Sequence, residues 1–306
     1  MNLLSLDGGG HVLSSGFNGV RLPDVPVTEF EELACVGEAI YPSAPGHFLS
    51  EILPRLLVLD MLLPEHVPLL WPAGAMPEQV LGEFRAEGVL SAVRPFPLLA
   101  TDGSRPQVQR ARRLFTLAST VEAASRSPLI LLISHRIMAE SIHEVVVARD
   151  AAARAAALAA GGAAPPPLEH GGIVVLTRGQ GRARSMTNEA ELLTALRGAF
   201  PGRRIDAFEP LESVLVVSQH LYGAALIIGP HGANLNNLYG ARAGAAVIEI
   251  AFAGGMLFPS DYFCLARNLG LRYWLSPSAE GEYGTPMRVH VEDVVAIAKL
   301  ALEGAL

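Results

Sequence analysis

The sequence contains little cysteine: Cys35 and Cys264 are the only two among its 306 residues. Two thiols do not build a disulfide framework, and no Cys-x-x-Cys or His-Glu-x-x-His spacing for zinc is present. A disulfide-held module and the common zinc motifs are therefore excluded. Cysteine content leaves the cellular compartment open.

Long hydrophobic runs are also absent. No run approaches the roughly 18 apolar residues of a membrane span, and residues 1–20 lack the basic start and apolar centre of a secretory signal. We expect a soluble chain without a membrane span. A gene model that had lost its N-terminus would look the same.

Positive charge is scarce. The chain has 23 Lys and Arg against 30 Asp and Glu, a net charge of −7. Proteins that bind nucleic acid normally show a clustered positive excess, so we expect no nucleic-acid partner. An anionic ligand would have to be met by local basic groups.

Motifs of two common enzyme classes are missing. The absence of Gly-x-Gly-x-x-Gly argues against a dinucleotide-dependent oxidoreductase. Residues 4–10, LSLDGGG, look like the oxyanion loop of patatin-type lipases, but the Gly-x-Ser-x-Gly elbow that such enzymes need does not occur. An α/β hydrolase therefore stays only as a weaker alternative.

The hydrophobic content is sufficient for two cores. Half of the residues are hydrophobic, and 306 residues exceed the usual size of one domain. Residues 148–172 break the composition, because an alanine-rich, helix-favouring start gives way to two glycines and three prolines. We place an N-terminal domain at 1–147, a linker or insertion at 148–172 and a C-terminal domain at 173–306.

Strand-like and helix-like segments alternate in the C-terminal domain. This pattern predicts a parallel sheet covered on both faces, with ligands at the carboxyl ends of the strands. The predicted strands are 173–177, 205–208, 225–229, 245–250 and 272–275, and the predicted helices are 189–200, 212–222, a short one from about 233, 262–269 and 291–302.

The first half is less regular. A second α/β domain is the economical prediction. Its strands would be 34–40, 67–71, 93–99 and 130–133, and its helices 47–61, 77–87 and 136–160.

The stretch Gly229-Pro230-His231-Gly232-Ala233 ends one predicted strand and opens a helix. Free backbone N–H groups and the positive end of a helix suit a phosphate, and an imidazole stands beside them. Gly232 would let the backbone approach a ligand closely. Asn234, Asn236 and Asn237 add amide donors. The alternative is a tight turn in which these side chains only cap the helix.

A second basic loop, residues 177–184 or TRGQGRAR, follows the first strand of the C-terminal domain. Forked hydrogen bonds from Arg178, Arg182 and Arg184 would neutralise a diphosphate. A solvated basic loop is the alternative, but two such loops at one sheet edge favour an anion site. Glu249 lies 20 residues after Gly229, at the end of the predicted strand 245–250, where an acid commonly accepts hydrogen bonds from ribose hydroxyls or is simply solvated.

The order of these motifs is similar to that of glycosyltransferase family 61. In that family a strand ending in Arg leads to a second Arg and an Asn-Glu-x-Glu-Leu helix start, as with Arg178, Arg184 and Asn188 here. A Gln-containing helix, a Gly-x-His-Gly-Ala turn with a nearby Asn and a Val-Ile-Glu strand follow. The likeness covers roughly residues 35–62 and 130–275.

The N-terminal part of the resemblance is GHFLSEILPRL, residues 46–56. It is similar to a His-aromatic-x-x-acid-x-x-Pro-Arg helix of the family, except that Phe48 stands where Trp is commoner. His47 and Glu51 are four apart and would share one helix face, where either could take a proton from an acceptor hydroxyl. The alternative is an ordinary pair of Glu51 and Arg55 on a helix surface.

The resemblance implies a GT-B arrangement, with two facing Rossmann-like α/β domains and the nucleotide-sugar held mainly by the C-terminal one. It implies an inverting transfer from a UDP-sugar to a hydroxyl of a protein or polysaccharide acceptor. We expect Arg178, Arg184, His231 and the helix beginning near Ala233 to stabilise the departing diphosphate, Glu249 to hold the ribose, and Glu51 or His47 to be the base. A catalytically degenerate homologue that only binds a nucleotide or glycan is the alternative.

We expect that catalysis requires no metal ion, because cationic side chains and a helix end are available and no convincing Asp-x-Asp pair is found. Divalent ions still assist some members of the family. Members use different sugars, including N-acetylglucosamine and xylose, and occur in the secretory lumen or in bacterial cytoplasm. The sequence selects neither sugar nor compartment.

Overall fold

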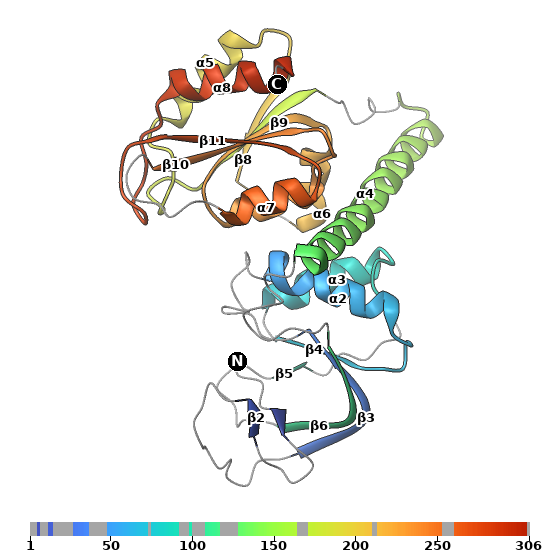
Figure 1. Cartoon of the computed structure of the whole chain (residues 1–306). Coiled ribbons are helices and arrows are strands. Elements are labelled where there is room, and N and C mark those ends of the chain that lie inside the picture. The colour runs from blue at the N-terminus through green and yellow to red at the C-terminus, as the bar shows by residue number, and fades with distance from the viewer. Residues whose placement is uncertain are drawn as a thin grey trace. The chain divides into compact units, whose positions relative to one another are not determined.

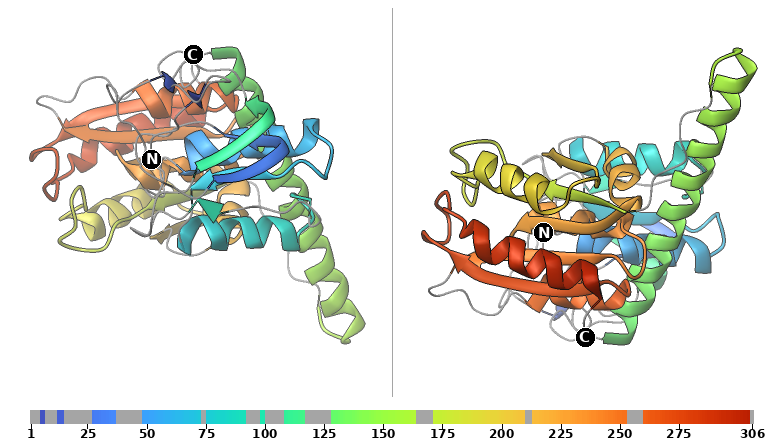
Figure 2. Two further views of the ribbon diagram at one scale, coloured as in Figure 1. Left: turned by 90° about the horizontal axis from the view of Figure 1, so that it is seen from below. Right: turned by 90° about the horizontal axis from the view of Figure 1, so that it is seen from above.

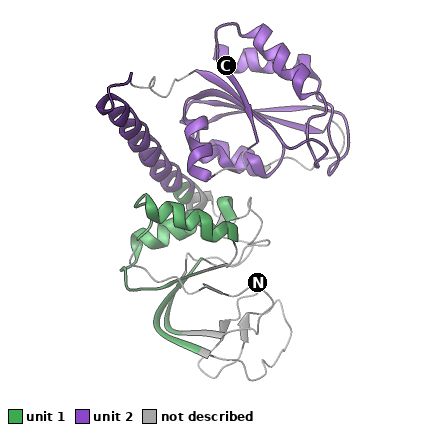
Figure 3. Cartoon of the chain, turned by 180° about the vertical axis from the view of Figure 1, so that it is seen from behind, with its two compact units in different colours: residues 1–134 green, residues 135–306 purple. Residues whose placement is uncertain are grey.

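The computed structural model describes residues 5–6, 12–14, 27–36, 48–72, 75–91, 98–99, 108–116, 128–163, 171–209, 213–252 and 260–304. The chain forms two compact units, residues 1–134 and 135–306 (Figure 3). Within the described residues, no helix is long and apolar enough to cross a membrane.

A five-stranded parallel sheet organises the second unit. Its order is β11-β10-β9-β7-β8. The central strands are buried along nearly their whole length and are apolar except for Glu249 of β10, as expected when helices cover both faces of a sheet. The strands are β7 (Gly172–Leu176), β8 (Ile205–Phe208), β9 (Ala224–Pro230), β10 (Ala246–Phe252) and β11 (Arg272–Ala279).

Helices cover the two faces of this sheet (Figure 1). On one face α5 (Glu189–Ala199) and α8 (Val291–Glu303) lie side by side, as the right-hand view of Figure 2 shows. On the other are α6 (Val214–Tyr222), the 3₁₀ helix η2 (Ala233–Gly240) and α7 (Ser260–Asn268). The prediction of an α/β unit with a parallel sheet is confirmed.

Local signals set the ends of these helices. Ser213 caps α6, because its Oγ accepts a hydrogen bond from the Val216 N–H at 3.3 Å. Gly304 ends α8 in the left-handed conformation that glycine adopts most easily. Leu192 and Leu196 of α5 and Val294 of α8 are fully buried in the core cluster against the sheet.

The order of the strands creates a switch point between β7 and β9. The chain leaves β7 to build β8 on one side and returns to build β9 on the other. In open α/β sheets, ligands bind at such a point, outside the carboxyl ends of the strands. The two loops expected to bind an anion follow these two strands.

The first unit has a smaller parallel sheet. Its order, β5-β4-β3-β6, matches the 3-2-1-4 order of Rossmann folds. Leu33, Cys35 and Leu70 form a buried cluster on it. The elements are β1 (Ser5–Leu6) paired antiparallel with β2 (Val12–Ser14), β3 (Val27–Cys35), η1 (Phe48–Ile52), α2 (Leu53–Leu62), β4 (Leu69–Pro72), α3 (Ala75–Ala86), β5 (Leu98–Leu99) and β6 (Val108–Thr116).

Two expectations for this half are corrected. The strand predicted at 130–133 is wrong, because these residues belong to α4 (Pro128–Ala159). Their apolar run continues at helical spacing through the buried Met138 and Ile142. The sequence analysis did not predict β6, because its three arginines obscure the alternation of apolar and polar residues that marks a strand. It is held to β3 partly by cross-strand ion pairs, Arg112 with Glu31 at 3.5 Å and Arg113 with Glu32.

The division between the units falls inside α4. From His135 onward this helix packs on the second unit: the Asn268 side-chain amide and His135 Nδ1 are 3.2 Å apart, and Arg136 Nε donates to the Asn268 carbonyl at 3.2 Å. The predicted linker, 148–172, therefore begins within the helix, and its residues 164–170 lie outside the described part of the chain.

Candidate functional site

Two loops meet at the switch point of the second sheet. One comprises residues 177–188 after β7, and the other comprises residues 231–233 after β9. Asn234 joins them, because its Nδ2 donates to the carbonyl oxygen of Thr177 at 2.7 Å. The loop pair is thus held together by the chain itself.

The guanidinium groups of Arg178 and Arg184 converge on Gly232. A Cβ placed on Gly232 would collide with Arg178 Nη1 and would lie 3.1 Å from Arg184 Nη1. Gly232 also has φ +143°, a conformation that other residues rarely adopt. From the sequence we expected Gly232 to let a ligand approach the backbone closely. In the structure the side chains of Arg178 and Arg184 make this close approach.

Neither arginine has a carboxylate partner within the described residues. Arg178 Nη1 and Arg184 Nε are buried atoms without a hydrogen-bond partner there. Burial, and then the charge of Arg184, lower the pKa of Arg178. Two adjacent cations with buried, unpaired N–H groups are unfavourable until an anion accepts those hydrogen bonds.

The C-terminal segment, residues 280–290 between β11 and α8, fixes the backbone of Arg184. Arg184 has φ +63°, the only positive value at a non-glycine position in the described chain. Its N–H donates to the carbonyl of Thr285 at 2.6 Å. Its guanidinium carbon lies 4.8 Å from the ring centre of Tyr283. Uncommon backbone conformations of this kind gather at functional sites.

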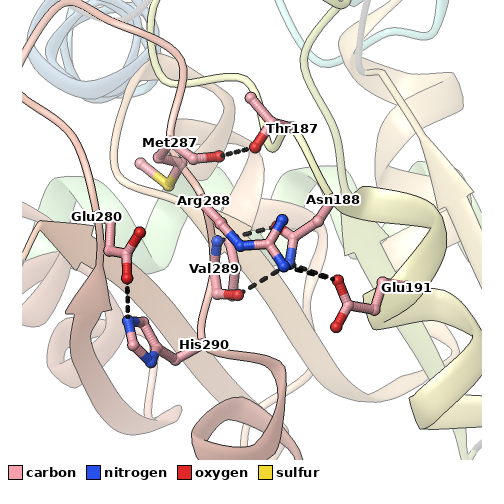
Figure 4. A network of polar contacts seen from close by, with 8 residues as sticks. All are labelled: Thr187, Asn188, Glu191, Glu280, Met287, Arg288, Val289 and His290. Atoms are coloured by element: carbon pink, nitrogen blue, oxygen red, sulfur yellow. Dashed lines mark hydrogen bonds and ion pairs between the residues drawn. The ribbon is translucent and has the colours of Figure 1, made fainter.

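Asn188 ties the same loop to the C-terminal segment (Figure 4). Its Nδ2 donates to the Val289 carbonyl at 2.9 Å and to Glu191 at 3.1 Å, and its Oδ1 accepts from the Val289 N–H at 2.9 Å. Thr187 Oγ1 donates to the Met287 carbonyl at 3.1 Å. The amide of Asn188 is therefore engaged within the chain.

Arg182 also has a partner. Its Nη1 lies 2.9 Å from Glu209 Oε1, and its side chain is 61% exposed. Of the three arginines expected to meet a diphosphate, the structure brings Arg178 and Arg184 together at Gly232 and pairs Arg182 with an acid.

His231 contacts a fully buried acid. Its Nδ1 is hydrogen-bonded to Glu249 Oε1, while the Tyr273 hydroxyl donates to Glu249 Oε2 at 2.5 Å. Burial, and then this hydrogen bond to Glu249, raise the pKa of Tyr273, so its hydroxyl stays protonated as a donor. The structure therefore favours a role for Glu249 through His231 over direct binding of a ribose, because no part of Glu249 is exposed.

The segment after Gly232 is less open than expected. The His231 N–H, which we expected to be free, donates to the Ile250 carbonyl at 2.8 Å. Asn237 Nδ2 donates to the Asn234 carbonyl at 3.0 Å. Ala233 opens η2, which is a 3₁₀ helix and not an α-helix. The backbone amide of His231 and the side-chain amides of Asn234 and Asn237 therefore stabilise the turn. In the described chain, the N–H groups left for a ligand come from the arginine side chains.

The N-terminal motif is only partly described. Glu51 lies in η1, a π-helical turn, but its side chain is outside the described part, as is all of His47. Phe48 is fully buried, and Arg55 is buried with its Nη1 3.4 Å from the Val36 carbonyl. The roles of Glu51 and His47 as base stay predictions.

The sequence reasoning missed the tyrosines around His231. The rings of Tyr262 and Tyr283 lie 5.3 and 6.1 Å from the imidazole, centre to centre. Tyr283 stands between glycines in a segment with no periodic pattern, so no local signal marked it. Across the described residues, no group of three or more His, Cys, Asp or Glu side chains gathers as a metal site would require.

The fold and the site define an α/β protein with two parallel sheets and paired cations at a sheet switch point. The family model for Glycosyltransferase 61 matches residues 46–248, about two thirds of the chain. The chain therefore belongs to glycosyltransferase family 61, and it is a glycosyltransferase by this membership. No curated protein matches it.

Proposed function

We propose that the chain is an inverting glycosyltransferase that moves a sugar from a UDP-sugar to a hydroxyl of a protein or polysaccharide acceptor. One observation carries the donor assignment: Arg178 and Arg184 lie against Gly232 at the switch point with buried N–H groups that lack partners in the described chain. A diphosphate supplies the negative oxygens that such groups bind best.

The same arrangement suits the chemistry of the leaving group. When the acceptor hydroxyl attacks the anomeric carbon, charge builds up on the departing diphosphate. Fixed cations stabilise this charge without reorganising during the reaction. No metal is required in this proposal, because Arg178, Arg184 and His231 supply the positive charge.

The base belongs to the first unit in this proposal. Glu51, or His47 beside it, takes the proton of the acceptor hydroxyl. This requires a GT-B arrangement in which the first unit faces the switch point of the second and closes on the donor. Family membership and the two parallel sheets support this arrangement.

Isothermal titration of UDP against arginine variants tests the donor site. Each hydrogen bond to a charged group contributes on the order of 1.5–3 kcal/mol, so Arg178→Ala and Arg184→Ala should each raise the Kd for UDP by about 10- to 100-fold. Arg204→Ala is the matched control, because Arg204 pairs with Asp206 next to β8, at 2.8 Å. UDP binding that survives both substitutions unchanged would exclude this donor site.

Sugar transfer tests the base and separates the enzyme from a homologue that only binds. Glu51→Ala should keep the UDP affinity of the wild-type chain and lose transfer from the donor that it uses. Full transfer by Glu51→Ala would show that Glu51 is not the base. Donor binding without transfer or hydrolysis in the wild-type chain would favour the degenerate alternative.

A further inference from the structure

The acid behind His231 has an unusual environment. Glu249 has no exposed surface, and its two oxygens accept from His231 Nδ1 and from the Tyr273 hydroxyl. No arginine or lysine pairs with it within the described residues. A buried carboxylate is costly unless it is hydrogen-bonded and its charge is balanced. The imidazole of His231 is the group in contact with Glu249 that can balance the charge by taking a proton.

The contact with Glu249 also determines which ring nitrogen faces outward. The two nitrogens lie on different edges of the imidazole, so engaging Nδ1 with the buried acid leaves Nε2 for the other side. His231 Nε2 has no hydrogen-bond partner among the described residues, and 12% of the side chain remains exposed. The next residue, Gly232, contacts the guanidinium groups of Arg178 and Arg184.

The other titratable groups around the His231 ring do not compete with Glu249 for its Nδ1. Tyr262 from α7 and Tyr283 from the C-terminal segment contact the ring, and Tyr283 contacts Arg184 in turn. Burial, and then the charges of Glu249 and Asp261, raise the pKa of Tyr262, so its hydroxyl remains neutral. Glu249 is the one acid in hydrogen-bond contact with His231 in the described chain.

We propose that Glu249 and Tyr273 are positioning residues that hold His231 with Nδ1–H toward the acid and Nε2–H toward the diphosphate. His231 then acts as the third cationic donor beside Arg178 and Arg184. This role rests on the proposed function and replaces contact of Glu249 with a ribose. A carboxylate that orients an imidazole and stabilises its protonated form is a recurrent device in enzymes.

Steady-state transfer kinetics test the consequence for the reaction. Glu249→Gln keeps the side-chain shape and removes the charge, so kcat should fall by about 10- to 100-fold, in the range found when a donor to a developing charge is lost. Tyr273→Phe should give a smaller fall in kcat. Because UDP already carries the diphosphate, the Kd for UDP should also rise in Glu249→Gln, but by less than in the arginine variants, because Arg178 and Arg184 remain. Tyr222→Phe, which removes a hydroxyl from a ring packed on His143 instead, is the matched control.

Nitrogen-15 NMR of the imidazole gives a readout that a purely structural role would not move. The chain has nine histidines, and the His231 signals can be assigned with His231→Gln. In the wild-type chain Nδ1 should carry the proton, and added inorganic pyrophosphate should produce a ring with both nitrogens protonated. Glu249→Gln should lose this second protonation at neutral pH.

The outcomes separate this inference from the proposed function. A wild-type ring that carries its proton on Nε2 alone, or a Glu249→Gln variant with wild-type kcat, would overturn the positioning role even if UDP binds. Failure of UDP to bind the wild-type chain would reject the donor assignment, while the ring spectra would still decide the role of Glu249. If Glu249→Gln does not fold, the wild-type spectra and Tyr273→Phe decide it.

Discussion

Gly232 determines how closely two arginines can stand beside the end of β9. An alanine there would place its Cβ against Arg178 Nη1 and 3.2 Å from the guanidinium carbon of Arg184, at a φ of +143°. We expect Gly232→Ala to lower the free energy of unfolding by about 1–3 kcal/mol and to abolish measurable UDP binding, as observed by urea unfolding and titration calorimetry.

The control for this substitution is Gly244→Ala. Gly244 also has a positive φ, +86°, but a Cβ there meets nothing within 4 Å. Gly244→Ala should lower the free energy of unfolding only by the backbone strain, about 1–2 kcal/mol, and should leave UDP binding intact. Equal loss of binding in both variants would show that strain, and not the collision with the arginines, is the cause.

Some contacts of individual residues could be predicted from the sequence, and others could not. The grouping of Arg178, Arg184 and Gly232 was predictable, because strand ends of a parallel sheet share one edge. The ion pair of Arg182 with Glu209 was not predictable, because it joins loops after two different strands. The burial of Glu249 is also a tertiary property, since nothing in Val-Ile-Glu-Ile distinguishes a solvated acid from an enclosed one.

At the level of elements, the turn after β9 is held by close packing of η2 on α6. A Cβ on Gly240 would lie 2.5 Å from Ser218 Cα and 2.8 Å from Ser218 Cβ. Backbone atoms cannot move aside as a flexible side chain can, so Gly240→Ala should destabilise the fold by about 1–3 kcal/mol. Gly198→Ala in α5, where a Cβ meets nothing within 4 Å, should instead stabilise it by about 0.5–1 kcal/mol. Thermal unfolding of the two variants would show opposite shifts, and a fall for both would contradict the assignment of α5.

The C-terminal segment beyond β11 is the second support of the site. Asn188→Ala removes the hydrogen bonds to both backbone groups of Val289 and leaves those groups buried. A cost of about 1–3 kcal/mol follows for each buried group left unsatisfied. Glu191→Gln, which weakens an exposed pair with Arg288 at 3.4 Å, should change the free energy of unfolding by less than about 1 kcal/mol. Urea unfolding compares the two, and similar values would mean that the network in Figure 4 is not held by Asn188.

The elements also differ in how well the sequence predicts them. In the second unit each strand is a short apolar run and each helix has helical spacing, so the predictions agree with the structure to within a few residues at most ends. In the first unit, β6 is paired through charged residues and the start of α4 is uniformly apolar. Periodicity is uninformative in both cases, because neither segment presents one apolar and one polar face.

On the scale of the whole molecule, the net charge of −7 contrasts with the two arginines at the switch point, which have no carboxylate partner among the described residues. An acidic surface repels a nucleotide at long range, but this repulsion is screened beyond about 8 Å at physiological ionic strength. Contacts at the site therefore decide whether the anion binds. The proposed catalytic base lies in the other unit, so transfer depends on how both units meet the donor.

Hydrogen exchange on the full chain tests that dependence. UDP should slow exchange in the loops after β7 and β9, residues 177–188 and 231–240, because a ligand stabilises the state that it binds. The facing arrangement predicts that the donor together with an acceptor also protects residues 48–62 of η1 and α2, while the exposed end of α4, residues 151–159, exchanges as before and serves as the internal control. Protection confined to the second unit, under conditions in which transfer proceeds, would mean that the first unit does not close on the donor and that the base must be sought among the residues of the second.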